Sequence, residues 1–180
     1  MTIPRYRLAL FLALLATVIA ARAEVKSAAS DGFLISYAKR VDAPPAKVYS
    51  ALALIDRWWN GEHSYSGSAA NLSLQLQAGA CFCERWSEGS VEHGRVILAM
   101  RDQMLRLQTA LGPLQGRAVT GVLTFQLQPA ETGTQLTMTY LVSGTSASAL
   151  EKSAPAVDGV LGEQFARLVR LVETGKAAAQ

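Results

Sequence analysis

In several segments between Phe33 and Val142 apolar and polar residues alternate with a period of two, and this alternation restricts what the chain can fold into. Successive side chains of a β-strand point to opposite faces, so these segments are predicted strands with one buried and one wet face. An antiparallel sheet that is covered on a single side has this pattern. We therefore predict an α+β protein whose sheet of about seven strands needs another element to cover its apolar face.

The predicted strands are separated by turn residues such as glycine and proline. The first strand runs from Phe33 to Val41 and ends before Ala43-Pro44-Pro45, because prolines fit the first turn of a helix and no strand interior. The inward positions of the later strands are Leu72, Leu74, Leu76, Phe82, Glu84, Trp86, Leu105, Leu107, Leu123, Phe125, Leu127, Leu136, Met138 and Tyr140.

Two segments have the period of a helix instead. After the first strand, apolar residues spaced four, three and four positions apart indicate one helix that ends near Asn60-Gly61: Val48, Leu52, Ile55 and Trp59. The last segment, APAVDGVLGEQFARLVRLVETG, carries a longer apolar stripe and ends in a glycine, a common helix stop. The stripe consists of Val157, Val160, Leu161, Phe165, Leu168 and Val172. We expect this long helix to cover the sheet, and a curved sheet around one helix can enclose a cavity.

The N-terminus is typical of an export signal. Arg5 and Arg7 precede an uncharged run over residues 8–21, and Ala21-Arg22-Ala23 has the small-x-small pattern of a cleavage site. The run is shorter than the roughly 20 residues that a membrane-spanning helix needs, although an uncleaved anchor stays an alternative. We expect residues 1–23 to be removed and residues 24–180 to form one periplasmic or secreted domain without a membrane span.

The charge of the mature chain excludes one class of partner. Three of the 17 basic residues, Arg5, Arg7 and Arg22, lie in the leader, so the remaining basic residues balance the 14 acidic ones. A neutral domain without a cluster of Lys and Arg offers nucleic acid no electrostatic footing. The sequence also contains no nucleophile-elbow, HExxH or phosphate-loop motif, and we expect no cofactor. Whether the chain has a protein partner stays open.

Several stretches resemble one superfamily. The segments VDAPPAKVYSALALIDRWWN, GACFCERW, GRVILAM and LTMTYLVSG, followed by the closing helix, are similar to the START-like (SRPBCC, helix-grip) superfamily, and most to its branch of activators of the heat-shock-protein ATPase. The resemblance covers residues 33–174. It implies a curved antiparallel sheet wrapped around a long C-terminal helix, with short helices after the first strand. It leaves function open, because the superfamily includes lipid carriers, hormone receptors, polyketide cyclases and chaperone activators.

Cys81 and Cys83 lie one residue apart on a predicted strand. On a regular strand both point outward with Cα atoms about 6.5 to 7 Å apart, at or beyond the reach of a disulfide, so a bridge would have to distort the strand. The alternative is a zinc or copper site completed by His63 or His93, although the cysteines of familiar zinc sites are spaced more widely. We expect no stable metal site, and the redox state of the pair stays open.

Glu84 shares its predicted face with Phe82 and Trp86, where a carboxylate is costly unless it is paired, hydrogen-bonded or exposed to a wet cavity. We therefore expect a mostly apolar pocket between helix and sheet. Its predicted lining is Trp58, Trp59, Phe82, Glu84, Trp86, Leu107, Leu123, Phe125, Met138, Tyr140, Val157, Val160, Leu161 and Phe165. Such a pocket favours the binding or transport of a small hydrophobic or amphipathic molecule.

Two other functions stay open. Glu84 and Tyr140, together with His93, are candidate acid–base groups of a cyclase-like or dehydratase-like enzyme. If the core is instead filled and Glu84 is an ordinary structural pair, the outer face of the sheet makes the chain an interaction domain.

The leader generates the first prediction, which is that the mature chain begins at Glu24. The intact mass of the exported protein should equal that of residues 24–180. A periplasmic product that retains residues 1–23 would contradict the export signal.

Overall fold

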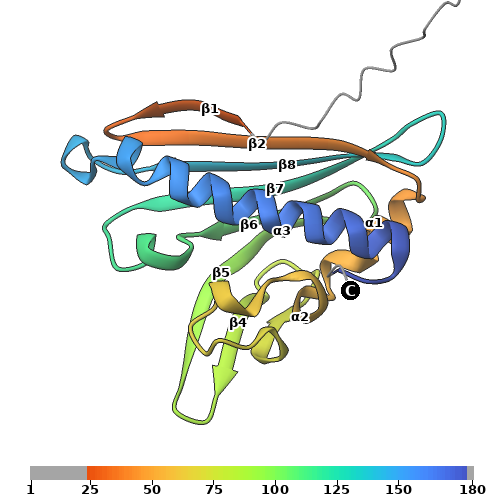
Figure 1. The fold of residues 1–180 in the computed structure, drawn as a ribbon, viewed down its shortest axis with the longest axis horizontal. Coiled ribbons are helices and arrows are strands. Elements are labelled where there is room, and N and C mark those ends of the chain that lie inside the picture. Colours follow the sequence, from red (N-terminus) through yellow and green to blue (C-terminus); the bar gives the residue numbers. More distant parts are fainter. Residues whose placement is uncertain (1–23, 178–180) are drawn as a thin grey trace, which may run out of the picture.

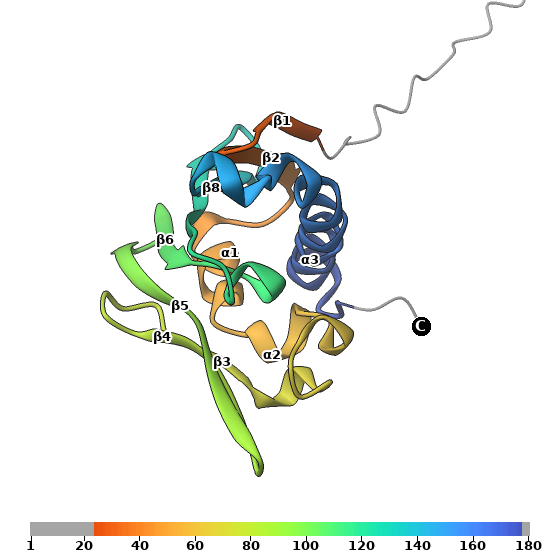
Figure 2. The ribbon, with the colours of Figure 1, turned by 90° about the vertical axis from the view of Figure 1, so that its left-hand side faces the viewer.

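A computed structural model describes residues 24–177, so the predicted signal peptide, residues 1–23, lies outside the described residues. The fold is α+β, as predicted. One antiparallel sheet has the order β1-β2-β8-β7-β6-β5-β4-β3, and it curves around α3 (Figures 1 and 2). Its strands are β1 (Glu24–Ala29), β2 (Gly32–Val41), β3 (Leu72–Leu74), β4 (Cys81–Trp86), β5 (Gly89–Met100), β6 (Met104–Thr109), β7 (Thr120–Pro129) and β8 (Thr134–Ser143). The α-helices are α1 (Pro45–Leu52), α2 (Ile55–Trp58) and α3 (Ala154–Thr174). None of the helices among residues 24–177 is long and apolar enough to cross a membrane.

The sheet has eight strands where about seven were predicted. The additional strand, β1, has the sequence EVKSAA and pairs only with the first half of β2, from Gly32 to Ser36. Most of its side chains are exposed, so it has no buried face and its sequence lacks the alternation that identifies the other strands.

The helix predicted after the first strand is divided into α1 and α2, with the break at Ala53–Leu54. Helix α2 ends at Trp58, and the extended backbone of Trp59 allows two adjacent indoles to be buried. Trp58 is 1% exposed and packs against Phe125, whereas Trp59 is 6% exposed and packs against Phe82. On one continuous helix neighbouring side chains point about 100° apart, which would turn one indole away from the sheet.

Helix α3 covers the concave face of the sheet as expected. It begins with Pro155 in its first turn and ends at Gly175, which has a φ of 78° that favours glycine. Its buried apolar side chains meet the inward positions of the strands in one core. These inward residues, each at most 2% exposed, include Phe82, Leu105, Leu107, Leu123, Phe125, Met138 and Tyr140. The apolar spacing of two residues in the strands and of 3.6 residues in the helix therefore predicts these core residues correctly.

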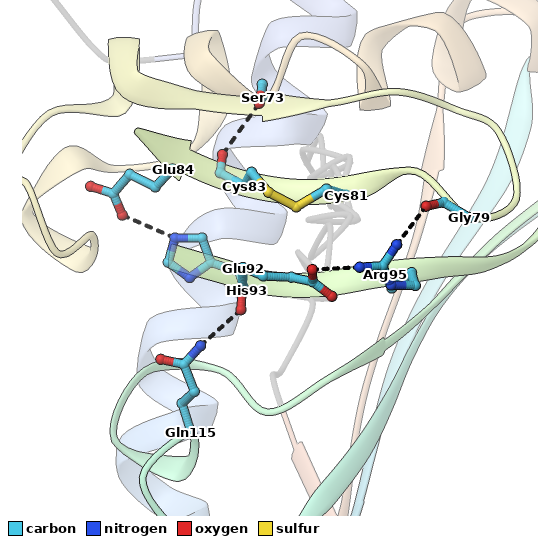
Figure 3. The surroundings of a disulfide bond; sticks show 9 residues. All are labelled: Ser73, Gly79, Cys81, Cys83, Glu84, Glu92, His93, Arg95 and Gln115. Carbon is cyan, nitrogen blue, oxygen red and sulfur yellow. Dashed lines mark hydrogen bonds and ion pairs between the residues drawn. A yellow bond between two sulfur atoms is a disulfide. The ribbon is translucent and has the colours of Figure 1, made fainter. Parts of the chain in front are cut away.

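The pairing of β4 with β5 contains a β-bulge. Phe82 pairs with Gly94 and Cys83 pairs with Glu92, so His93 is an extra residue on β5. At the same place Cys81 and Cys83 form a disulfide, and their Cα atoms are 5.3 Å apart (Figure 3). The predicted separation is therefore wrong, because β4 is distorted here, and Cys83 is buried instead of facing outward. The two sulfurs bond each other and are not available as thiolate ligands.

The disulfide generates the second prediction. Because it joins residues only two positions apart, we expect the Cys81→Ser, Cys83→Ser double variant to fold and to lose about 1 to 2 kcal/mol of unfolding free energy in urea. Zinc and copper analysis should give well under one metal per chain for both proteins. Free thiols in the native parent would contradict the bridge, and stoichiometric metal that the double variant loses would restore the metal-site hypothesis.

Candidate functional site

A cavity of about 750 Å³ lies beside the N-terminal half of α3. Its apolar wall joins Val157, Val160 and Leu161 of α3 to Leu111 and Leu114, which lie between β6 and β7. Polar side chains line the rest, and they are Glu62, His63, Ser64, Tyr65, His93, Arg117, Lys152 and Ser153. Trp59, Gly112, Pro113 and Ala156 complete the lining. A volume of this size lies within the roughly 300 to 1,000 Å³ that small-molecule sites occupy.

Hydrogen bonds hold the segment between β6 and β7 in place as one wall. The backbone N–H of Leu111 donates to Tyr140 Oη at 3.1 Å, which ties the start of the segment to β8. At its end, Arg117 donates to Ser153 Oγ at 2.8 Å and to the carbonyl of Ser148, both just before α3. These bonds fix both ends of this wall, one to β8 and the other to the residues just before α3.

Two carboxylates hold the segment of residues 60–66 as the opposite wall. Glu84 of β4 accepts the backbone N–H of Ser66 at 2.6 Å and that of Tyr65 at 3.0 Å. Glu163 of α3 accepts the Asn60 side-chain amide at 2.7 Å and lies 3.1 Å from Nε2 of His63. The sheet and the helix therefore fix the same segment from two sides.

Glu84 also pairs with His93, and Glu84 is the most deeply buried charged side chain of the site. The distance from His93 Nε2 to Glu84 Oε2 is 2.9 Å (Figure 3). Glu84 is 0% exposed and His93 is 7% exposed. The bulge in β5 accounts for this contact, because the extra residue lets the His93 side chain occupy the inner face beside Glu84.

The pKa values of the two groups are shifted downward. Burial raises the pKa of Glu84, but hydrogen bonds from Ser66, Tyr65 and His93 outweigh burial and lower the pKa to about 2. Burial lowers the pKa of His93 below its ordinary value of 6.5, and the bond to Glu84 opposes this only in part. At neutral pH an ionised carboxylate therefore accepts the Nε2–H of a neutral imidazole.

The predicted lining residues occupy three different places. Trp59, Val157, Val160 and Leu161 line the cavity. Glu84 lies behind its wall and reaches it through His93, and Trp86 is half-buried in the β4–β5 hairpin, outside the lining. The other predicted residues belong to the packed core, and they are Trp58, Phe82, Leu107, Leu123, Phe125, Met138, Tyr140 and Phe165.

Tyr140, predicted as an acid–base candidate, has a structural position. Its hydroxyl accepts the N–H of Leu111 and lies 3.5 Å from the carbonyl of Thr109. The side chain is fully buried, and burial raises its pKa to about 12. Tyr140 therefore supports the wall of the cavity without lining it.

The wall between β6 and β7 is not predicted by the sequence pattern. The segment LGPLQGR has two leucines around a Gly-Pro pair, which signals a turn with apolar side chains that need a partner. Its path across the end of the sheet depends on distant partners such as Tyr140 and Ser153, which periodicity does not reveal.

No protein-family model and no curated protein matches the chain. Solved structures do match it. A protein of Mesorhizobium loti is 20% identical with a TM-score of 0.58, over 77% of this chain and 96% of that one. The Aha1 dimer of Colwellia psychrerythraea is 19% identical with a TM-score of 0.54, over 79% and 98%. Protein SA2116 of Staphylococcus aureus, of unknown function, is 15% identical with a TM-score of 0.58, over 81% and 96%. At these identities the likeness is one of fold, consistent with a helix grip.

The Glu84 contacts generate the third prediction. We expect Glu84→Gln to lower the unfolding free energy at pH 7 by about 2 kcal/mol, because the new amide must turn a donor toward one of the N–H groups that the carboxylate accepts. The exposed Glu88→Gln should change it by less than about 0.5 kcal/mol. Urea unfolding measures both.

The same pair sets a pH dependence. The unfolding free energy of the parent should fall as the pH drops below 6.5, because unfolded His93 then takes up a proton that burial opposes in the folded chain. It should fall further from pH 4.5 towards about 2 as Glu84 is protonated. Glu84→Gln should lack the second decline relative to Glu88→Gln, and parallel curves below pH 4.5 would contradict the lowered pKa of Glu84.

Proposed function

We propose that the protein is an exported helix-grip domain that binds or carries a small hydrophobic or amphipathic molecule in the cavity beside α3. The observation that supports this most directly is the cavity itself. Its volume is about 750 Å³, and apolar side chains of α3 and of the segment between β6 and β7 line it. Concave apolar sites with a few placed polar groups are the usual form of small-molecule sites.

The polar groups of the mouth favour an amphipathic ligand. Lys152 is exposed beside the start of α3 and forms no ion pair within residues 24–177. Arg117 lies next to it and already binds two backbone or hydroxyl oxygens. A ligand with an apolar body along Val157 and Val160 could therefore place an anionic or strongly polar head near Lys152.

Two features support an exported location. The leader has the pattern of a cleaved signal peptide, and the Cys81–Cys83 disulfide suits an oxidising compartment. An exported domain does not meet a cytosolic ATPase, so this location argues against the chaperone-activating role that the family resemblance raises.

The fourth prediction tests ligand binding. Fatty acids, isoprenoids and aromatic polyketides are screened by thermal shift against the parent and the Val160→Phe variant. We expect one class to raise the melting temperature of the parent. We also expect Val160→Phe to stay folded but to bind at least about tenfold more weakly, because an open cavity absorbs added volume that a packed core does not.

The matched control is Val122→Phe, because Val122 lies on the outer face of β7, away from the cavity. It should bind as the parent does. If no compound stabilises the parent and Val160→Phe simply unfolds, the interior is solid core and the chain is an interaction domain. Native mass spectrometry of protein purified from its own host checks independently for a retained small molecule.

A further inference from the structure

One ring nitrogen of His93 is hydrogen-bonded within residues 24–177, and the other is not. Nε2 binds Glu84 at 2.9 Å, while Nδ1 has no hydrogen-bond partner among the described residues. Nδ1 is also not sealed inside the protein, because the only buried, unpartnered side-chain oxygen or nitrogen of residues 24–177 is Glu151 Oε2. His93 lines the large cavity and also a smaller one of about 260 Å³, which is lined by residues of β5, of β6 and of the segment between β6 and β7. The nitrogen with the free lone pair is therefore accessible.

The surroundings of the ring fix its orientation. The centroids of the His93 and Phe82 rings are 4.8 Å apart, and those of His93 and Tyr65 are 5.8 Å apart. The carbonyl of His93 accepts the Thr109 hydroxyl at 2.5 Å, which holds the bulge against β6. A side chain whose ring, backbone and Nε2 are all held in place loses little entropy when a ligand binds beside it.

Glu84 determines which nitrogen is basic. An ionised carboxylate only accepts hydrogen bonds, so the neutral ring carries its proton on Nε2 and keeps its lone pair on Nδ1. If Nδ1 takes up a proton, the resulting imidazolium lies beside a fixed negative charge in an apolar setting, which stabilises it. If Glu84 served only to hold the segment of residues 60–66 in place, its hydrogen bonds from two backbone N–H groups of that segment would be enough. A histidine beside Glu84 would not be needed.

We propose that His93, positioned by Glu84, is a general base that removes a proton from an activated C–H of a hydrophobic carbonyl compound bound in the cavity. This rests on the proposed ligand binding. The C–H proton moves to Nδ1, and the electron pair of that bond moves into the carbonyl group to give an enolate. In a β,γ-unsaturated carbonyl compound this enolate extends over the C=C bond, so the imidazolium returns the proton to the γ-carbon and the double bond moves into conjugation with the carbonyl group. The result is an isomerisation that consumes no oxidant, reductant or cofactor.

The fifth prediction tests this with 5-nitrobenzisoxazole, which reports a base in an apolar pocket without knowledge of the natural substrate. Loss of its C–H proton to the base forms a nitrile, breaks the N–O bond and releases a coloured phenolate. We expect saturable turnover by the parent and a loss of about 100-fold in kcat for His93→Gln, the range that a positioned base contributes. Glu84→Gln should also lose activity, whereas the exposed Glu88→Gln should not.

The pH profile identifies the base. The rate should rise with pH, with a midpoint below 6.5, and then level off as His93 becomes neutral. Several other titratable or charged groups lie around His93. Glu84 and Tyr65 contact its ring. The large cavity is also lined by Glu62, His63, Arg117 and Lys152, and the smaller cavity by Glu92 and Arg95. His93→Gln should abolish this midpoint, and a midpoint that persists in the variant would assign it to another group and overturn the proposal.

Binding and chemistry fail in different ways. If the probe binds, as judged by competition with a ligand from the thermal-shift panel, but is not turned over faster than by free imidazole, only the general base is excluded. If neither the probe nor any panel compound binds, both proposals fall. Long-range ¹⁵N–¹H spectra of the two histidines provide a readout that needs no variant: His93 should carry its proton on Nε2 at pH 7. A proton on Nδ1 would overturn the assignment.

Discussion

The carboxylate of Glu84 is the interaction on which the architecture of the cavity depends. A charge with no exposed surface is stable only if several donors surround it. Here the donors come from two places that are far apart in the sequence, the backbone at Tyr65 and Ser66 and the ring of His93. The buried charge therefore forces a loop and a strand to meet, and the position where they meet is the end of the sheet where α3 leaves space.

The remaining walls follow from that meeting point. With the segment of residues 60–66 fixed against β4, Glu163 and Gln164 on α3 bind its first residue, Asn60, from the other side. The helix packs closely against the sheet along its C-terminal half, where Phe165, Leu168 and Val172 are buried. Its N-terminal half faces the segment between β6 and β7 across the cavity instead. One half of α3 therefore belongs mainly to the packed core, and the other half lines the cavity.

The sequence pattern predicts the parts of the fold that rest on a repeated spacing of apolar residues. It does not predict the parts that depend on a single contact between distant residues. Period two correctly predicts the inward side chains of β6 to β8, and the apolar stripe with its terminal glycine predicts α3. The bulge at His93 shifts the pattern by one residue, which no periodicity can signal. The end of α2 before Trp59 allows two adjacent indoles to be buried, and the cavity wall at Leu111 is held by the Tyr140 hydroxyl. Glu84 was identifiable because a charge on an apolar face breaks the rule that the rest of its strand follows.

The two outer strands give the open sheet unequal but well-protected edges. At one edge, β3 is only three residues long, and at the other, β1 is short, mostly exposed and carries Lys26. Short strands and edge lysines are poor templates for pairing with a second chain, because they offer few backbone groups and place a charge where a neighbour would have to pack. Resistance to edge-to-edge pairing with a second chain is therefore a property of the outermost strands of the sheet, not of its core.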